Sequence, residues 1–533
     1  MCTSTNRKGE GVKPEDPGPA DFERAIVQAG YGKFNYLLLL AILPASLSSI
    51  FSSSAMSYVL PSAECDLGLT MFDKGLLNSM SFAGMISTSF FWGFMTDTFG
   101  RKKIMLYGYM FAGLLSLATC FSHSSWLLIL FKFLDGVIIS GPYAALMSYL
   151  AEVHNETQRA RTYMWQGVFF SLGNISLPCI AWLVMTQKWK INLLGGAMEI
   201  NSWRVFLALC SIPEFIACFA LSAFPESPRF LLLKGRREEA LEVFKKIYAL
   251  NTGKDADTYP IKDLEDEYSV KTVGDTFASK VAGCWIQIKS LFVAPNICKL
   301  AVISMIQLGA TIGSNSLRLW MPQLFAMIER FKKFSIETND TSVTPSFCHM
   351  LGQESGNSSA ANFINHSLTA TGKCVPAELN STVFINSIVI AVTGLIGYTI
   401  AGTLITVIGK KKLMAICFLV ASACCASLYW AENANGILGL SSVFVAMSSI
   451  GGAAVVNIIV DNFPTCLRTM AVTTTMMAGR VGAIVGNLLF SILIDLSCVG
   501  PFAMIGSASL ISALLILALP RKKLAQEKAK EIA

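Results

Sequence analysis

The sequence predicts an all-α integral membrane protein, with twelve transmembrane helices arranged as two pseudo-symmetric halves of six helices each. Three observations predict this fold: the apolar composition, twelve long apolar segments, and loop motifs that recur at a single offset. Of the 533 residues, 53% are hydrophobic and only 14% are charged. A soluble protein needs more charge than this to cover its surface. The excess apolar surface is therefore expected to face lipid.

Each predicted span is an apolar segment of about 20 residues, the length that crosses roughly 30 Å of hydrocarbon as a helix. The first six are residues 36–60, 75–95, 104–121, 126–151, 162–186 and 204–224. The other six are residues 299–327, 383–408, 413–431, 438–460, 470–495 and 499–519. Because these segments are continuously apolar rather than alternating, helices are favoured over the strands of a barrel.

Polar segments separate the two halves from each other and from the tails. We expect a tail at 1–35, one half at 36–224, a central segment at 225–298, the other half at 299–520, and a tail at 521–533. Residues 1–33 lack the pattern of a cleaved signal, so the first span is expected to remain. The central segment has a helical apolar spacing, at Ala240, Val243, Phe244, Ile247 and Leu250. It predicts an amphipathic helix that either packs on the bundle or serves as a solvated linker.

The basic residues predict the orientation of the helices. Lys and Arg occur in loops on one side of the alternating spans, and the short loops opposite, such as 61–73 and 122–125, contain none. The basic loops and the C-terminal tail hold Arg101, Lys102, Lys103, Arg159, Arg161, Lys410, Lys411, Lys412, Arg468, Arg521, Lys522 and Lys523. The positive-inside rule therefore places both termini in the cytosol. Cations dispersed in this way also argue against nucleic-acid binding.

Two loop motifs recur between the halves in the same register. Gly93, Gly100 and Arg101 match Gly402, Gly409 and Lys410, and 402 − 93 = 309. Farther along, Glu152 and Arg159 match Asp461 and Arg468, and 461 − 152 = 309 again. Two separate segments that share one offset indicate duplicated halves.

The segment 329–382 is the one large loop on the predicted outer side. Four N-x-S/T sequons lie in it, at Asn339, Asn357, Asn365 and Asn380. We expect glycosylation of at least one of them. The loop also holds Cys348 and Cys374, which either form a disulfide in an oxidising lumen or remain two unpaired small residues. Two further sequons, at Asn155 and Asn174, fall on the cytosolic side and within a span, and are expected to be silent.

The motifs resemble those of the major facilitator superfamily. The sequence GFMTDTFGRKK resembles its signature between the second and third helices, and PESPRFLL resembles the signature that follows the sixth helix in sugar porters and organic-ion carriers. Over most of the chain, YVLPSAECDL, NSWRVFLAL and RLWMPQLF resemble the synaptic vesicle glycoprotein 2 group and its insect relatives. The outer loop is shorter than in the vertebrate members, so the chain is identified as a divergent relative.

The resemblance implies that the motif between the second and third helices is a latch. Gly93 would allow close helix approach, Asp97 would face a helix N-terminus, and Arg101 would bridge to Glu152. In the second half Thr406 replaces the acid, so that latch is expected to be weaker. The predicted gating residues are Gly93, Asp97, Gly100, Arg101, Glu152, Arg159, Asp461 and Arg468.

Ionisable residues within spans are costly and are therefore the candidates for a substrate site. The predicted site residues are Arg318, Arg480, Asn315, Asp135, Lys132, Ser49 and Ser52. Lys132 and Asp135 are three apart and either contribute to a site or neutralise each other. Arg318 shares a helix face with Asn315 and Thr311, and Arg480 shares one with Thr473 and Asn487. Each arginine either lines the cavity or has a structural role, capping backbone carbonyls or pairing with Asp135.

The leading hypothesis for function is a secondary carrier of a small organic ion, anionic or zwitterionic, that moves by alternating access. Ser49 and Ser52 stand where the relatives have acids, which removes the usual counter-charges for a cation. The alternative is a non-transporting vesicle glycoprotein that acts in trafficking or secretion. An enzyme is the least expected class, because no metal-binding, nucleotide-binding or CxxC motif is present. We expect no cofactor, and a monomer in a vesicle or plasma membrane.

Overall fold

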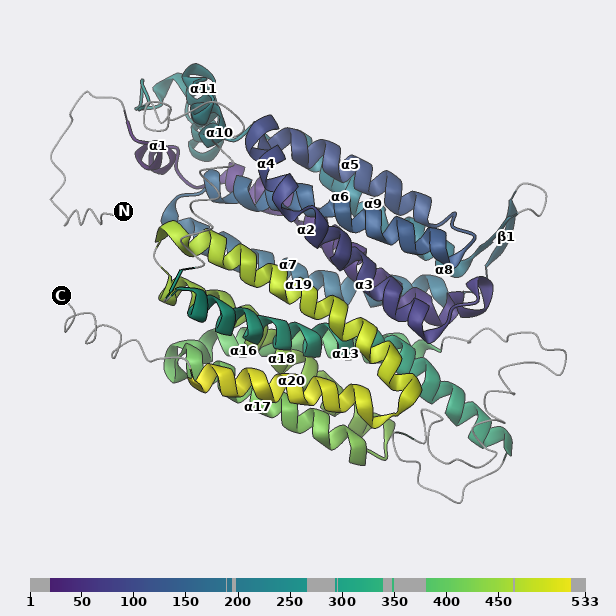
Figure 1. Cartoon of the computed structure of the whole chain (residues 1–533). Helices are drawn as coiled ribbons and strands as arrows, with labels where there is room; N and C mark the ends of the chain where they lie inside the picture. Colours follow the sequence, from purple (N-terminus) through teal and green to yellow (C-terminus); the bar gives the residue numbers. More distant parts are fainter. Residues whose placement is uncertain are drawn as a thin grey trace.

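The computed structural model describes residues 20–187, 189–193, 198–265, 293–294, 296–338, 348, 380–463 and 465–518. Its helices form two stacked layers, one from each half of the sequence (Figure 1). Three predicted sequons, at Asn339, Asn357 and Asn365, lie outside the described residues, as does Cys374. The side chain of Asp461 is also outside them.

The first layer is built from the N-terminal half. Its long helices are α2 (Lys33–Leu67), α3 (Met71–Ser87), α4 (Ser89–Phe99), α5 (Arg101–Thr119), α6 (Ser125–Glu152), α7 (Glu156–Met185), α8 (Ser202–Cys210) and α9 (Ile212–Ser222). The predicted second span is α3 and α4, interrupted at Thr88, and the sixth span is α8 followed by α9.

The second layer is built from the C-terminal half. Its helices are α13 (Asn296–Thr338), α16 (Ser381–Ile408), α17 (Lys410–Ser427) with the short η3 (Leu428–Trp430), α18 (Ala434–Asn462), α19 (Thr465–Leu496) and α20 (Val499–Ala518). Helix α13 continues to Thr338, and α16 begins at Ser381. The predicted outer loop 329–382 is therefore shorter at both of its ends than the sequence indicated.

Ten helices of the described part are long and apolar enough to cross a membrane. Two of the twelve predicted spans are not among them. One is the interrupted pair α3 and α4, and the other is α5, whose first turn carries Arg101, Lys102 and Lys103. With these two spans counted, the arrangement agrees with twelve transmembrane helices in two halves of six.

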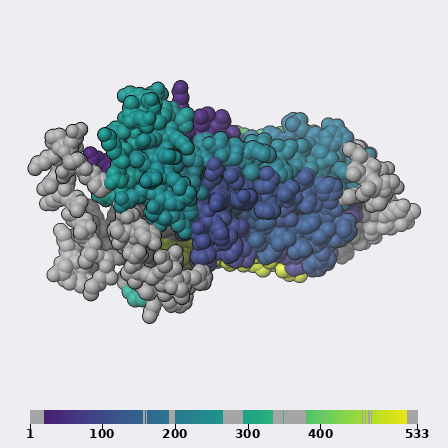
Figure 2. Space-filling model, turned by 90° about the horizontal axis from the view of Figure 1, so that it is seen from above, coloured from purple at the N-terminus to yellow at the C-terminus, as the bar shows by residue number. Residues whose placement is uncertain are grey.

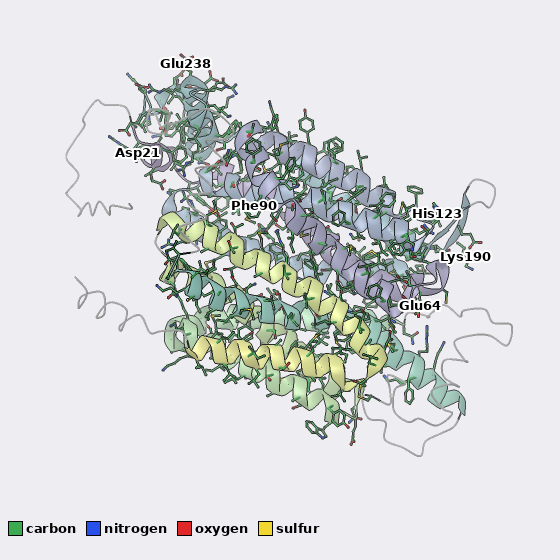
Figure 3. All side chains as sticks on the ribbon, viewed as in Figure 1. Asp21, Glu64, Phe90, His123, Lys190 and Glu238 are labelled. Atoms are coloured by element: carbon green, nitrogen blue, oxygen red, sulfur yellow. A yellow bond between two sulfur atoms is a disulfide. The ribbon has the colours of Figure 1, made fainter. Side chains whose placement is uncertain are left out.

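Small elements mark the two ends of the molecule. The α11 end carries α1 (Phe22–Gln28), α10 (Pro228–Leu233), α11 (Arg237–Thr252) and η2 (Ala256–Thr258). The β1 end carries the antiparallel strands β1 (Lys190–Leu193) and β2 (Met198–Asn201). Figure 3 labels Asp21 and Glu238 at the α11 end, and Glu64, His123 and Lys190 at the β1 end. Figure 2 shows the teal segment that holds α10 and α11 covering one end of the molecule.

Helix α11 is the predicted amphipathic helix, and its apolar face is packed. Ala240, Val243, Phe244 and Ile247 are all buried, whereas Leu250 is about half exposed. The Phe22 ring of α1 packs edge-on against Phe244, with 5.7 Å between the ring centroids. The helix is therefore attached to other elements of the fold and is not a free linker.

The repeat predicted from the loop motifs is visible in the backbone. Gly100 and Gly409 both have positive φ angles, +100° and +87°, and each immediately precedes a helix, α5 and α17. Residues with a side chain rarely adopt this conformation, so the motif requires glycine at both positions. These equivalent turns join the second helix to the third in each half.

The predicted disulfide between Cys348 and Cys374 is wrong. Cys348 is bonded to Cys498, with 5.5 Å between their Cα atoms. Cys498 lies in the turn between α19 and α20, at the β1 end. Antiparallel helices bring turns that are far apart in the sequence to the same end, so nearness in sequence is a poor guide to pairing. Cys65, at the end of α2, is also disulfide-bonded.

Candidate functional site

A cavity of about 270 Å³ lies between the two halves near the middle of the bundle. Helices α2 and α7 of one half and α13, α16 and α18 of the other supply its wall. The polar lining residues are Ser54, Ser57, Tyr58, Ser171, Asn174, Asn315, Arg318, Ser387, Tyr398 and Ser449. Among the lining residues that the structure describes, Arg318 is the one with a charged side chain.

Arg318 is held by neutral groups from three helices. Its Nη1 donates to Ser54 Oγ of α2 and to Asn174 Oδ1 of α7, each at 2.9 Å. Its Nη2 donates to Asn315 Oδ1 at 3.0 Å, one turn earlier on α13. No ion pair joins Arg318 to a carboxylate within the described part of the chain. The guanidinium therefore brings a net positive charge to the cavity.

The predicted pair Lys132 and Asp135 lies elsewhere, inside the N-terminal half. Lys132 Nζ is 2.6 Å from Asp135 Oδ2, and both side chains are buried. Ser52 Oγ donates to the same carboxylate oxygen at 2.8 Å. Neither member of the pair lines the cavity, and nor does Ser49 or Ser52. The pair is a self-neutralising group that joins α6 to α2.

Arg480 supports the backbone where the second span is interrupted. Its Nη1 donates to Ser89 Oγ at 2.8 Å and contacts the Met85 carbonyl oxygen at 3.4 Å. These partners lie on either side of Thr88, where α3 ends and α4 begins. Because a helix break leaves carbonyl groups without their usual partners, this contact has the structural role of a cap. Arg480 also joins α19 of the C-terminal half to the N-terminal half.

Three of the predicted gate residues, Asp97, Arg101 and Glu152, meet at the α11 end. Arg101 Nη2 lies 2.9 Å from Glu152 Oε1 and 2.9 Å from Asp97 Oδ1. The carboxylate of Glu152 also accepts a hydrogen bond from Ser227 Oγ, at 2.5 Å, in the segment that leads to α10. Arg101 and Glu152 are buried, whereas the side chain of Asp97 is 73% exposed. All four residues belong to the N-terminal half or to the segment that follows it.

Glu226 attaches the central segment to the same gate. Its Oε1 accepts hydrogen bonds from the backbone N–H groups of Arg101 and Lys102, each at 3.0 Å. A carboxylate at the first turn of α5 satisfies free N–H groups and complements the helix dipole. Arg159 lies farther out, 3.9 Å from Glu23 of α1. The equivalent Arg468 is described, but Asp461, the equivalent of Glu152, has no described side chain.

Gly93 does not bring two helices together in this structure. A side chain added there would meet no atom within 4 Å, and the same holds at the equivalent Gly402. At the β1 end the opposite is found, since a Cβ at Gly75 of α3 would lie 2.4 Å from Ser491 Oγ of α19. The halves are thus in close contact at the β1 end, whereas Gly93 and Gly402 at the α11 end face open space.

Comparison with protein families gives two matches along the chain. Residues 45–336, more than half of the chain, match the family described as sugar (and other) transporter, and residues 346–532 match the major facilitator superfamily. The chain belongs to the major facilitator superfamily. Solved structures of the E. coli xylose transporter XylE share this fold. One in a partially occluded inward open conformation has a TM-score of 0.62 and 12% identity, over 91% of this chain and 99% of that one.

Within the superfamily, the chain is similar to synaptic vesicle glycoproteins. It is 21% identical to human synaptic vesicle glycoprotein 2B over 97% of this chain and 88% of that protein. It is 32% identical to rat synaptic vesicle glycoprotein 2C, in an alignment that covers 43% of this chain and 32% of that protein. The resemblance of the motifs to this group is confirmed.

The cavity of this superfamily member includes residues that sequence reasoning did not select. Ser54, Ser57 and Tyr58 follow the two predicted serines along α2, but on the face that meets the other half. Asn174 belongs to a sequon that is expected to be silent, and an amide in the middle of a span is itself a signal of a polar surface. Thr311, expected beside Arg318, instead donates to the Gly479 carbonyl oxygen of α19 at 2.8 Å.

Proposed function

We propose that the protein is a secondary transporter of a small organic anion or zwitterion, with Arg318 as the residue that binds the negative group. The observation that carries the proposal is the uncompensated guanidinium in the cavity between the halves. A cation held only by neutral hydrogen-bond acceptors favours an anionic partner in a poorly hydrated site. The planar guanidinium matches a carboxylate with two parallel hydrogen bonds.

Alternating access is supported by the contrast between the two ends. At the β1 end the Tyr58 ring of α2 stacks on Phe384 of α16, with 6.4 Å between centroids, and Phe384 is fully buried. At the α11 end Gly93 and its equivalent Gly402 have open space beside them, and Asp97 is exposed. Because the positive-inside rule assigns the α11 end to the cytosol, this arrangement corresponds to a state that is closed on the outer side.

The test is uptake into proteoliposomes that contain the purified protein. We expect uptake of a monocarboxylate or an amino acid and none of a quaternary ammonium ion. Arg318→Gln should raise the KM for the anionic substrate about 30-fold, which corresponds to about 2 kcal/mol for a desolvated charge-assisted contact. Arg480→Gln is the matched control, since it removes the same charge from a span at a position outside the cavity wall. Equal KM effects of the two variants, or selectivity for cations, would overturn the proposal.

A second candidate function is suggested by the similarity to synaptic vesicle glycoproteins. The protein would then reside in a vesicle membrane and act in trafficking or secretion without transport. The two candidates differ in one measurement, substrate-dependent flux through proteoliposomes. A protein that binds an organic anion at Arg318 but moves none across the membrane would favour the second candidate.

A further inference from the structure

A second cavity, of about 470 Å³, lies at the α11 end, apart from the cavity between the halves. It is formed by the starts of α2 and α5, the end of α9, and α11 with the turn that follows it. Its lining residues are Phe34, Lys102, Ala223, Phe224, Pro225, Lys246, Ala249, Leu250 and Ala256. Its volume is within the range of pockets that bind small molecules, roughly 300–1,000 Å³.

Two lysines give this cavity a positive charge. Neither Lys102 nor Lys246 forms an ion pair with any described residue. No acidic residue is among the described residues that line the cavity. Of the acids nearby, Glu226 accepts hydrogen bonds from the backbone at the start of α5, and Asp257 pairs with Lys245 at 3.3 Å. The two ammonium groups are therefore available for an anion from outside the protein.

The rest of the cavity wall is apolar and continues onto exposed apolar surface. Phe34 of α2 packs edge-on against Phe224, with 5.5 Å between the ring centroids. Helices α2 and α9 both run from this contact toward the middle of the bundle. Leu37 and Leu40 of α2 are exposed along this stretch, as are Ile216 and Phe219 of α9. Helices α2 and α9 pack against each other. Basic groups at the end of an apolar, lipid-facing surface fit an amphipathic ligand better than a free ion.

We propose that this cavity binds the phosphate-bearing headgroup of an anionic phospholipid, with the acyl chains lying along α2 and α9. The assignment of the α11 end to the cytosol, made with the proposed function, would place this lipid in the cytosolic leaflet. Lys102 follows Arg101 of the gate directly, and Lys246 lies on α11. The bound headgroup therefore joins α11 to the helix that carries the gate arginine.

The test is thermal unfolding of the full-length protein, purified in a neutral detergent and titrated with a short-chain phosphatidylinositol phosphate. The lipid should raise the Tm, and Lys102→Gln with Lys246→Gln should weaken its apparent affinity at least tenfold, because one lysine near an anionic lipid contributes roughly fivefold. The control is Lys103→Gln with Lys262→Gln, which removes the same charge at positions outside the cavity wall. The same Tm titration is carried out with phosphatidylcholine, with the free inositol phosphate and with inorganic phosphate.

The outcomes separate the possible sources of binding. Equal loss of affinity in the control variant would mean diffuse surface charge and would overturn the proposal. Binding of inositol phosphate or inorganic phosphate as tight as that of the lipid would also overturn it, in favour of a soluble anion. If the double variant does not fold, Leu250→Trp fills the cavity without a change of charge and should also weaken lipid binding. Arg318→Gln should leave lipid binding intact, so failure of the transport proposal does not affect this test.

Discussion

Two arginines within spans of the C-terminal half have different surroundings. Arg480 donates hydrogen bonds to a carbonyl oxygen and to a hydroxyl group at a helix break. Arg318 donates to a serine and two amides that line an open cavity. Arg480 therefore stabilises a helix break, whereas Arg318 faces a cavity that a ligand can enter.

At Asp97, we predict that substitution by Asn changes the conformational equilibrium and leaves folding intact. The carboxylate is 73% exposed, so its pair with Arg101 adds little to stability in the present arrangement. In the state closed at the α11 end, the same charge would face a helix N-terminus, and its loss should disfavour that state. A cysteine introduced near the gate should then react faster with a soluble thiol reagent.

The control for this experiment is Glu238→Gln, which removes an exposed carboxylate from the same end of the molecule (Figure 3). It should leave the labelling rate unchanged. The prediction is wrong if Asp97→Asn and the control give the same rate while both proteins are expressed normally.

The roles of individual residues were predictable from the sequence only where the resemblance to a known motif indicated both partners of a contact. The bridge from Arg101 to Glu152 followed from the resemblance, and its geometry agrees. The role of Ser227, which donates to Glu152, was not foreseen, although PESPRFLL was recognised. Ser52 was predicted because it stands where the relatives have acids. Which face of a helix meets the other half depends on tertiary packing, so the sequence did not predict Ser54 and Asn174.

At the scale of elements, the contact between α3 and α19 closes the β1 end. A side chain at Gly75 would overlap Ser491 Oγ and approach the Asn487 carbonyl oxygen to 3.0 Å. Gly75→Val should therefore push these helices apart and favour opening at the β1 end by about 1–3 kcal/mol, the usual cost of overpacking. Crosslinking of a cysteine pair across α3 and α19 at that end should fall at least fivefold.

Gly436→Val provides the comparison, since a side chain at that glycine of α18 would meet no atom within 4 Å. Crosslinking should be unaffected by it. Retention of full crosslinking in Gly75→Val would show that the helices accommodate the added bulk without opening.

Hydropathy predicted the number and order of the helices but not their interruptions. The break at Thr88 falls within a continuous apolar segment. It is stabilised by the contacts of Arg480 with Met85 and Ser89, and by the Thr88 hydroxyl, which donates to the Gly84 carbonyl oxygen at 3.1 Å. The extension of α13 to Thr338 was hidden by polar residues, because hydropathy reports the lipid boundary and not the end of a helix.

At the scale of the whole molecule, the predicted topology has a direct test in glycosylation. Asn380 is exposed at the start of α16, at the β1 end. Glycosidase treatment of protein from its own cells should increase gel mobility, and Gln at Asn339, Asn357, Asn365 and Asn380 should abolish that shift. Asn155→Asp removes a sequon at the α11 end while keeping a residue able to cap α7, and should leave the shift unchanged.

Loss of the shift in the Asn155→Asp variant alone would place the α11 end in the lumen and reverse the topology. Native protein that shows no mobility change at all would also contradict the predicted orientation.

The overall architecture was the most predictable level, since a repeated register at 309 residues and twelve apolar segments leave few alternatives. The equivalent positive-φ turns at Gly100 and Gly409 agree with that repeat. The two halves are nevertheless unequal in chemistry. A side chain at Gly100 would meet the Glu226 carboxylate, whereas one at Gly409 would meet nothing within 4 Å. Duplication thus predicts the shared backbone and not the partners that each copy acquires later.

The bond between Cys348 and Cys498 turns 150 residues of sequence into a closed covalent ring. Helices α16, α17, α18 and α19 all lie inside this ring, and α20 lies outside it. Tension along the chain between α13 and α20 would therefore pass through two sulfur atoms and bypass the four enclosed helices. Pulled from the C-terminus, an oxidised molecule should release α20 and then resist, whereas a reduced one should go on to lose its helices in turn.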